Sequence, residues 1–163
     1  MRRQTTNGNN LPRQRGEAIL EAAFVGVLIL FMIFGTLDFS RAMYAYHWVS
    51  YAAREGTRWA SVRGAGCQTL PGGCPATGAQ VQTFVRSIVA PVMDSAAVSA
   101  TTTWTGKGGD GTDCTNGGAL PNNSAGCVVK VQVDYSFGFI LPLSSVTGKT
   151  VDLQSTSQMV ISQ

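Results

Sequence analysis

Histidine is almost absent from this 163-residue chain, which contains only His47. A Ser/His/Asp or Cys/His catalytic unit needs an imidazole as its base, so His47 is the sole candidate. It closely follows a long apolar run, and an active site built on it would have to lie near a membrane surface. We therefore expect a surface or helix-packing histidine and a chain that is not an enzyme.

Acidic residues are missing from the first sixteen positions, whereas basic residues are not. Four arginines lie there: Arg2, Arg3, Arg13 and Arg15. The rest of the chain has eight basic against nine acidic residues, so the net charge of +3 is a property of this leader. No basic face remains that would indicate nucleic acid as a partner.

An uncharged, mostly apolar run occupies residues 22–37 and, with residues 18–20, predicts a transmembrane segment over about 18–39. A helix needs about 20 apolar residues to cross a bilayer. No Ala-x-Ala pattern follows the run, so a signal-peptide cut at its far end is not expected. The positive-inside rule puts the N-terminus in the cytoplasm and the C-terminal part outside the cytoplasmic (inner) membrane.

Glu21 opens this apolar run, and its role has two interpretations. In one, it lies near a helix end and reaches the headgroups, which costs less than the roughly 2.5–3.5 kcal/mol of an acid at mid-membrane. In the other, it is present because it meets a positive charge inside the lipid.

Two sequence stretches carry a family resemblance. The first is Arg15-Gly16-Glu-Ala-Ile-Leu-Glu21-Ala-Ala-Phe24, which is similar to the start of type IV prepilins. The second consists of two nearby ranges, residues 35–44 and 52–60. Together, the two stretches resemble the TadE-like minor pilins (pseudopilins) of the tight-adherence, or Flp-type, pilus system. The resemblance is specific from about Arg13 to Arg63.

The resemblance implies a prepilin peptidase that cuts after Gly16 and leaves Glu17 as the first residue of the mature chain. It implies that Glu21, as the fifth mature residue, serves subunit assembly. The expected partners are other pilin subunits, the pilus assembly machinery and membrane lipid. Many relatives have an aromatic residue directly after this glutamate, where this chain has Ala22.

The organisation expected from these patterns has three parts: a basic prepilin-type leader (1–16), a long helix (17–62) and an extracytoplasmic domain (63–163). On the outer part of the helix, Arg54, Glu55, Arg58 and Arg63 fit a solvated face, and Trp59 fits a packing surface. The spacing from residue 78 predicts a second, short helix that Pro91 stops. Strands are expected over 97–104, 127–137 and 150–161, with Val129, Val131, Val133 and Tyr135 on one face of the middle one. The predicted fold class is α+β, with a three-stranded antiparallel sheet and a pilin-like architecture.

A long loop over 106–126 separates the first two strands. Gly106, Gly108 and Gly111 match the spelling of a dinucleotide fingerprint, but no helix pattern or βαβ unit surrounds them, so no cofactor is expected. Asp110, Asp113 and Asn116 carry oxygen ligands of the kind that calcium takes, although their spacing misses the EF-hand register. We expect no metal there and leave calcium as an alternative.

The four cysteines, Cys67, Cys74, Cys114 and Cys127, all lie on the predicted outer side, where disulfides are permitted. Three pairings are possible. We favour Cys67 with Cys74 and Cys114 with Cys127, because each pair brackets a Gly/Pro-rich loop. A zinc site is the alternative, but there is no CxxC pair and His47 is far away in the sequence.

These patterns predict a non-catalytic minor pilin or pseudopilin that takes part in assembly of a tight-adherence type IV pilus or a related secretion filament. The alternative is a signal-anchored extracytoplasmic binding or adhesion module that does not join a filament.

Overall fold

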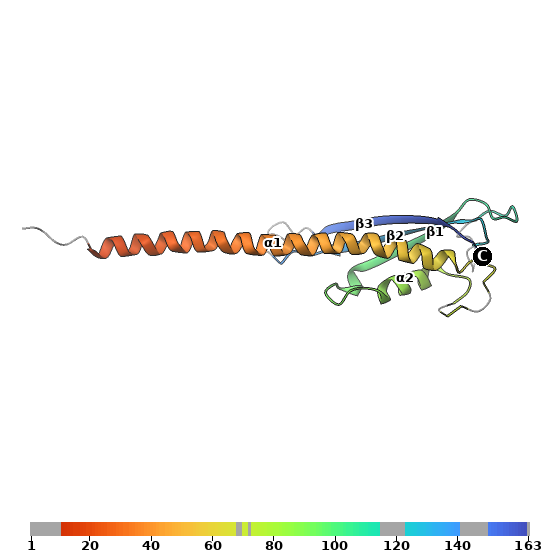
Figure 1. The fold of residues 1–163 in the computed structure, drawn as a ribbon, viewed down its shortest axis with the longest axis horizontal. Coiled ribbons are helices and arrows are strands. Elements are labelled where there is room, and N and C mark those ends of the chain that lie inside the picture. Colours follow the sequence, from red (N-terminus) through yellow and green to blue (C-terminus); the bar gives the residue numbers. More distant parts are fainter. Residues whose placement is uncertain (1–10, 68–69, 72, 115–122, 141–149, 163) are drawn as a thin grey trace, which may run out of the picture. The chain divides into compact units, whose positions relative to one another are not determined.

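The computed structural model describes residues 11–67, 70–71, 73–114, 123–140 and 150–162. Its elements are α1 (Leu11–Ser61), α2 (Gly78–Ser87), a 3-10 turn η1 (Ser95–Ala97), β1 (Val98–Thr105), β2 (Val128–Phe137) and β3 (Val151–Val160) (Figure 1). The α+β fold class is confirmed, and each strand lies within one residue of its predicted bounds. The chain divides after Ser40 into two compact units, which are described separately.

The first unit consists of the N-terminal part of α1. This helix begins at Leu11, six residues before the predicted start at Glu17. Pro12 is tolerated in the first turn because the amide that it lacks would have no helical partner there. Gly16 alone costs only about 1 kcal/mol in a helix interior, so nothing stops the helix between these residues.

From Gly16, α1 is long and apolar enough to cross a bilayer, with a mean hydropathy of 2.5 over its most apolar window. None of that window is buried within the protein. Ile19, Leu20 and Phe24 are 65–75% exposed, for example. Such a surface is unfavourable in water, and this helix therefore indicates a membrane anchor.

The second unit, from Arg41 onward, contains the antiparallel sheet in the order β1-β2-β3. The middle strand alternates as predicted, because Val129, Val131 and Val133 are fully buried and Lys130 is exposed. A period of two is the pattern of a sheet with one covered face. The sheet thus has an apolar inner face and a polar outer face.

The outer half of α1 contributes small residues to the core beneath this sheet, including Ala45, Ala52, Ala53 and Ala60. At Gly56, the backbone of α1 lies close to side chains of both α2 and β2. A Cβ added there would lie 3.0 Å from Cγ2 of Val85 and 3.4 Å from Cγ1 of Val131. Small side chains on this helix face therefore let the sheet and α2 pack closely against α1.

Helix α2 is short and begins at a capping box. The Thr77 side chain accepts from the Gln80 amide at 3.3 Å, and the Gln80 side chain accepts from the Thr77 amide at 2.9 Å. Val81 and Val85 are its buried residues. The helix ends at Ser87, before the predicted stop at Pro91, and its first turn is held without help from an acidic residue.

Candidate assembly site

The predicted processing and assembly residues lie on one stretch of α1. Gly16, Glu17 and Glu21 are all within the continuous helix, and a Cβ added at Gly16 would meet nothing within 4 Å. Glu17 and Glu21 are both exposed and lie four residues apart, so they share one helix face. The structure brings the two carboxylates to the same face as a consequence of helix geometry.

Glu21 is surrounded by exposed apolar side chains. Its sequence neighbour Leu20 is 75% exposed, and Phe24, one turn on, is 65% exposed. Among the residues that the structure describes, Glu21 makes no hydrogen bond or ion pair. A carboxylate in such a setting is costly in lipid unless a cation or donor meets it.

The cysteines form two local disulfides in the second unit, Cys67 with Cys74 and Cys114 with Cys127. Both cysteines of the second pair are buried, and their bridge joins the middle of the loop between β1 and β2 to its C-terminal end. The bridges therefore hold the loops whose Gly/Pro-rich sequences give them little other restraint.

The described start of the 106–126 loop is a compact turn. Gly106 and Gly111 have φ values of +93° and +79°, and Lys107 pairs with Asp113 in an isolated bridge. Up to Cys114, where the described part of this loop pauses, no helix opens after these glycines, as a dinucleotide site requires. Asn116, the third residue of the calcium alternative, lies outside the described residues.

Asp110 accepts two hydrogen bonds in this turn, from the Thr112 amide at 3.1 Å and from the Thr112 hydroxyl at 2.6 Å. The Thr112 hydroxyl bond, followed by the Thr112 amide bond, lowers the pKa of Asp110 below its usual 3.8. The carboxylate thus organises its own loop, and the described residues contain no group of three or more His, Cys, Asp or Glu side chains able to hold a metal.

His47 is exposed on α1 and contacts Tyr46 edge to face, with ring centroids 6.1 Å apart. Trp48 lies next to it but is buried, and its Nε1 donates to the carbonyl of Ile88 at 3.3 Å. The aromatic residues on this part of α1 therefore divide between exposed tyrosines and a packed indole.

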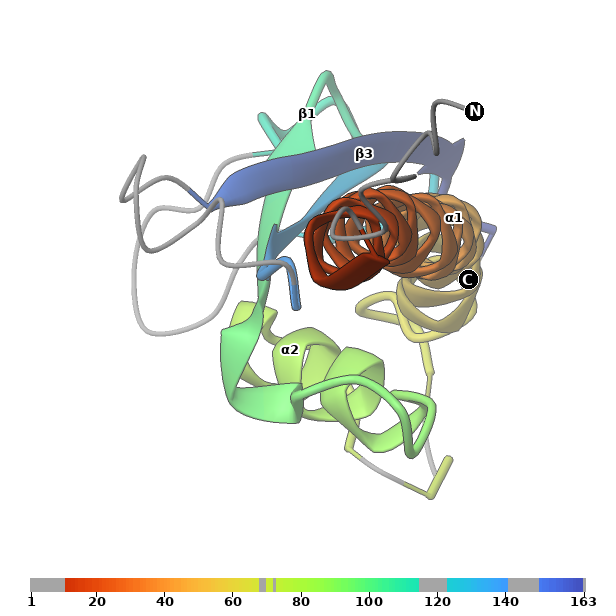
Figure 2. The same cartoon turned by 90° about the vertical axis from the view of Figure 1, so that its left-hand side faces the viewer.

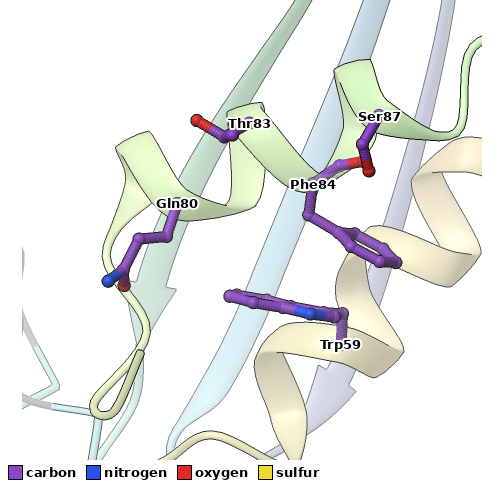
Figure 3. A pocket seen from close by; sticks show the side chains of 5 residues that line it. All are labelled: Trp59, Gln80, Thr83, Phe84 and Ser87. Carbon is purple, nitrogen blue, oxygen red and sulfur yellow. The ribbon is translucent and has the colours of Figure 1, made fainter. Parts of the chain in front are cut away.

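Trp59 lies on a packing surface, as predicted. Its indole stacks on Phe84, and together with Gln80, Thr83 and Ser87 the two rings line a shallow groove of about 250 Å³ (Figure 3). The Arg63 guanidinium lies 4.0 Å from the centroid of the same indole. Since an aromatic ring and a cation already contact the indole, the groove acts chiefly as the seam between α1 and α2.

Arg63 differs from the prediction, which put it on the solvated face. It is half-buried, and its two terminal nitrogens donate to the carbonyls of Trp59 at 3.1 Å and Pro71 at 3.0 Å. Desolvation lowers the pKa of Arg63 below its ordinary value. The helical periodicity indicates only which face of α1 Arg63 lies on. The carbonyl of Pro71 that covers Arg63 belongs to the loop after the helix, on which that periodicity carries no information.

Asn123 is a structural residue that the sequence did not indicate. It is fully buried, its side-chain Nδ2 donates to the carbonyl of Ala76 at 3.1 Å, and its backbone carbonyl accepts from the Ala65 amide at 3.0 Å. An asparagine in a Gly-rich stretch is typical of a turn, so no local signal distinguishes this role.

Comparison with known proteins identifies the N-terminal stretch. Residues 16–58 match the family described as TadE-like protein. No curated protein and no solved structure matches the chain. The matched residues contain the whole exposed apolar part of α1 and extend into its packed half. The predicted resemblance to TadE-like proteins is thus confirmed over residues 16–58.

Proposed function

We propose that this chain is a non-catalytic minor pilin, or pseudopilin, that takes part in assembly of a tight-adherence pilus or a related secretion filament. The observation that carries the proposal is the coincidence of the TadE-like match, residues 16–58, with an apolar helix that is exposed and bears Glu21. An exposed apolar helix with one carboxylate can insert into lipid, and after insertion it can pack against helices of neighbouring subunits.

The proposed orientation follows from the charge of the leader. Four arginines precede Glu17 and no acid does, so the positive-inside rule keeps that end in the cytoplasm. The unit from Arg41 onward then lies outside the inner membrane, where its disulfides are stable.

The proposed maturation step is cleavage after Gly16 by a prepilin peptidase. Because α1 is continuous from Leu11, this bond lies inside a helix, and a peptidase needs the helix to open locally. Gly16 weakens the helix by about 1 kcal/mol relative to alanine. The site also lies only five residues from the start of α1, where helices open most easily.

The new amino terminus at Glu17 would be a cation close to lipid, and Glu21 lies one helical turn away. We propose that Glu21 pairs with such a terminus, its own or that of a neighbouring subunit. The pair is attractive in a low dielectric, and removal of either partner leaves the other charge stranded. This cost favours a subunit that has joined the filament in the correct register.

Deletion of the chain from its host, followed by complementation, tests the proposed function. Piliation should fall in the deletion strain and return with the full-length chain. A deletion strain that assembles pili at wild-type levels but loses attachment to a surface would instead favour the binding or adhesion module.

A further inference from the structure

The two edges of the sheet differ in how they are covered. Along β1, helix α2 packs close by: a Cβ at Gly78 would lie 4.0 Å from Cβ of Thr102. Near the other end of β1, Nε of Arg86 donates to the carbonyl of Val98 at 3.1 Å. Helix α2 thus packs against the buried face of β1 and Arg86 bonds one of its outward carbonyls, so the β1 edge is partly covered.

Within the described part of the chain, no strand or helix pairs with the edge formed by β3. The Ile161 amide donates to the carbonyl of Cys127 at 2.8 Å, and bonding groups alternate in direction along an antiparallel strand. Residues 151, 153, 155, 157 and 159 therefore direct their backbone groups toward β2, and residues 152, 154, 156, 158 and 160 direct theirs outward. All five outward residues are exposed, and no hydrogen bond from the described part of the chain reaches their outward backbone groups.

The β3 edge also lacks the devices that normally protect an edge strand. Residues 151–160 contain no proline, lysine or arginine, and Asp152 is their only charged residue. All ten residues pair with β2 without an inserted residue, so no bulge turns the edge away. Long, regular and nearly uncharged edges of this kind accept an additional strand.

We propose that the β3 edge binds an extended segment of a different protein by strand addition. The inner side of β3 suggests the chemistry of that segment. Ser155 and Ser157 are half-buried there, between Leu153 and the 45% exposed Met159. Short serines leave room for larger apolar side chains on an adjacent strand, while Gln154, Thr156 and Gln158 face the polar side. The expected segment is uncharged, with an apolar residue at every second position.

A second copy of this chain does not fit the β3 edge when both copies are anchored in one bilayer. The shared bilayer is taken from the proposed function. β3 runs in the same direction as the part of α1 in its own unit, and Ser61 Oγ contacts Met159 Sδ at 3.3 Å where both elements end (Figure 1). If two β3 strands paired antiparallel, the two second units would face opposite ways, and their N-terminal ends at Arg41 would lie on opposite sides of the pair. A symmetric parallel pair would set identical backbone groups opposite each other. The β1 edge, which α2 and Arg86 partly cover, is less accessible for self-association than the β3 edge.

Site-specific photo-crosslinking of the full chain in its host tests this proposal. A benzoylphenylalanine at Gln158 should give a covalent adduct with one other protein, whereas the same probe at Thr101, on β1, should not. Thr156→Pro is the decisive variant because the Thr156 amide points outward, so proline removes a donor from the edge and none from the β2 ladder. The adduct should fall at least tenfold in Thr156→Pro and persist in Thr156→Ala.

Three results would overturn the proposal: no adduct from Gln158, an adduct with the mass of two copies, or an adduct that Thr156→Pro leaves unchanged. Formation of both disulfides reports whether Thr156→Pro is folded. If Thr156→Pro is not folded, Thr156→Lys replaces it and should reduce the adduct in the same way, because a lysine blocks an edge strand. Thr101→Lys, which adds a charge to the same polar face of the sheet, is its control. A negative result here leaves the role of Glu21 untouched, so the two proposals fail separately.

Discussion

The indole of Trp59 on α1 and the phenyl ring of Phe84 on α2 stack with their centroids 5.2 Å apart and an angle of 19° between the rings. Figure 2 shows α2 and the part of α1 from Arg41 onward lying on the same side of the sheet. The stack therefore joins two elements that the chain separates by a disulfide-containing loop.

Truncation of this stack should destabilise the second unit. We expect Trp59→Ala or Phe84→Ala to lower the free energy of unfolding by about 2 kcal/mol, below the value for a fully buried ring because both residues are only half-buried. A double-mutant cycle in urea should give a coupling of about 0.5–1.5 kcal/mol. Thr83→Ala, an exposed change on the same helix, is the control and should be nearly neutral. Additive effects of the two truncations would contradict the stacking account.

The disulfides are expected to be Cys67 with Cys74 and Cys114 with Cys127 in protein isolated from membranes. Non-reducing peptide mapping checks the pairing, and free thiols or a crossed pairing would contradict it. The Cys114→Ser/Cys127→Ser variant should lose about 2–4 kcal/mol of stability, because an unbridged loop has more freedom in the unfolded chain.

Asp110 should titrate below the usual aspartate range. Its pKa is lowered in the folded protein, so the stabilisation of the 108–112 turn is complete above the unfolded pKa and is lost as the pH falls through the folded pKa. Thr112→Val removes the hydroxyl donor and should raise the pKa of Asp110 toward 3.8. Carboxyl NMR titration measures both values, and an unchanged pKa in Thr112→Val would exclude the hydroxyl as the main cause.

The sequence predicted those elements whose own residues repeat with a strong period. The apolar run of α1 and the alternation of Val129, Val131 and Val133 each lie within one element, and both are confirmed. The expected start of the long helix at Glu17 rested on cleavage after Gly16, and in the uncleaved chain α1 extends back to Leu11 because a lone glycine has only a small helical penalty.

Residues whose role depends on contacts between distant segments were harder to predict. Arg63 receives its burial from the loop at Pro71, and Asn123 bonds Ala65 and Ala76, some fifty residues earlier in the chain. Periodicity reports only which face of an element is apolar. It does not report which loop will cover a particular side chain.

The mature chain is predicted to begin at Glu17. Intact-mass analysis of membrane-derived protein should show loss of residues 1–16, because the basic leader ends at Gly16 directly before the retained apolar helix. The same chain from cells without a prepilin peptidase should keep its leader. A full-length mass in cells with an active peptidase would contradict cleavage.

Glu21 carries the central claim, and its substitution separates membrane insertion from assembly. Glu21→Ala and Glu21→Gln should both insert at wild-type levels, because each removes a charge from an apolar span. A Glu55→Gln variant, on the outer part of α1, provides the matched loss of one carboxylate.

The most direct measurement is the amount of each inserted variant recovered in purified pilus complexes. We expect recovery of Glu21→Ala and Glu21→Gln to fall at least tenfold, since loss of one partner strands the other charge in a low dielectric, and recovery of Glu55→Gln to match wild type. Wild-type recovery and normal piliation with both Glu21 variants would contradict the account and leave Glu21 as a tolerated acid near a helix end.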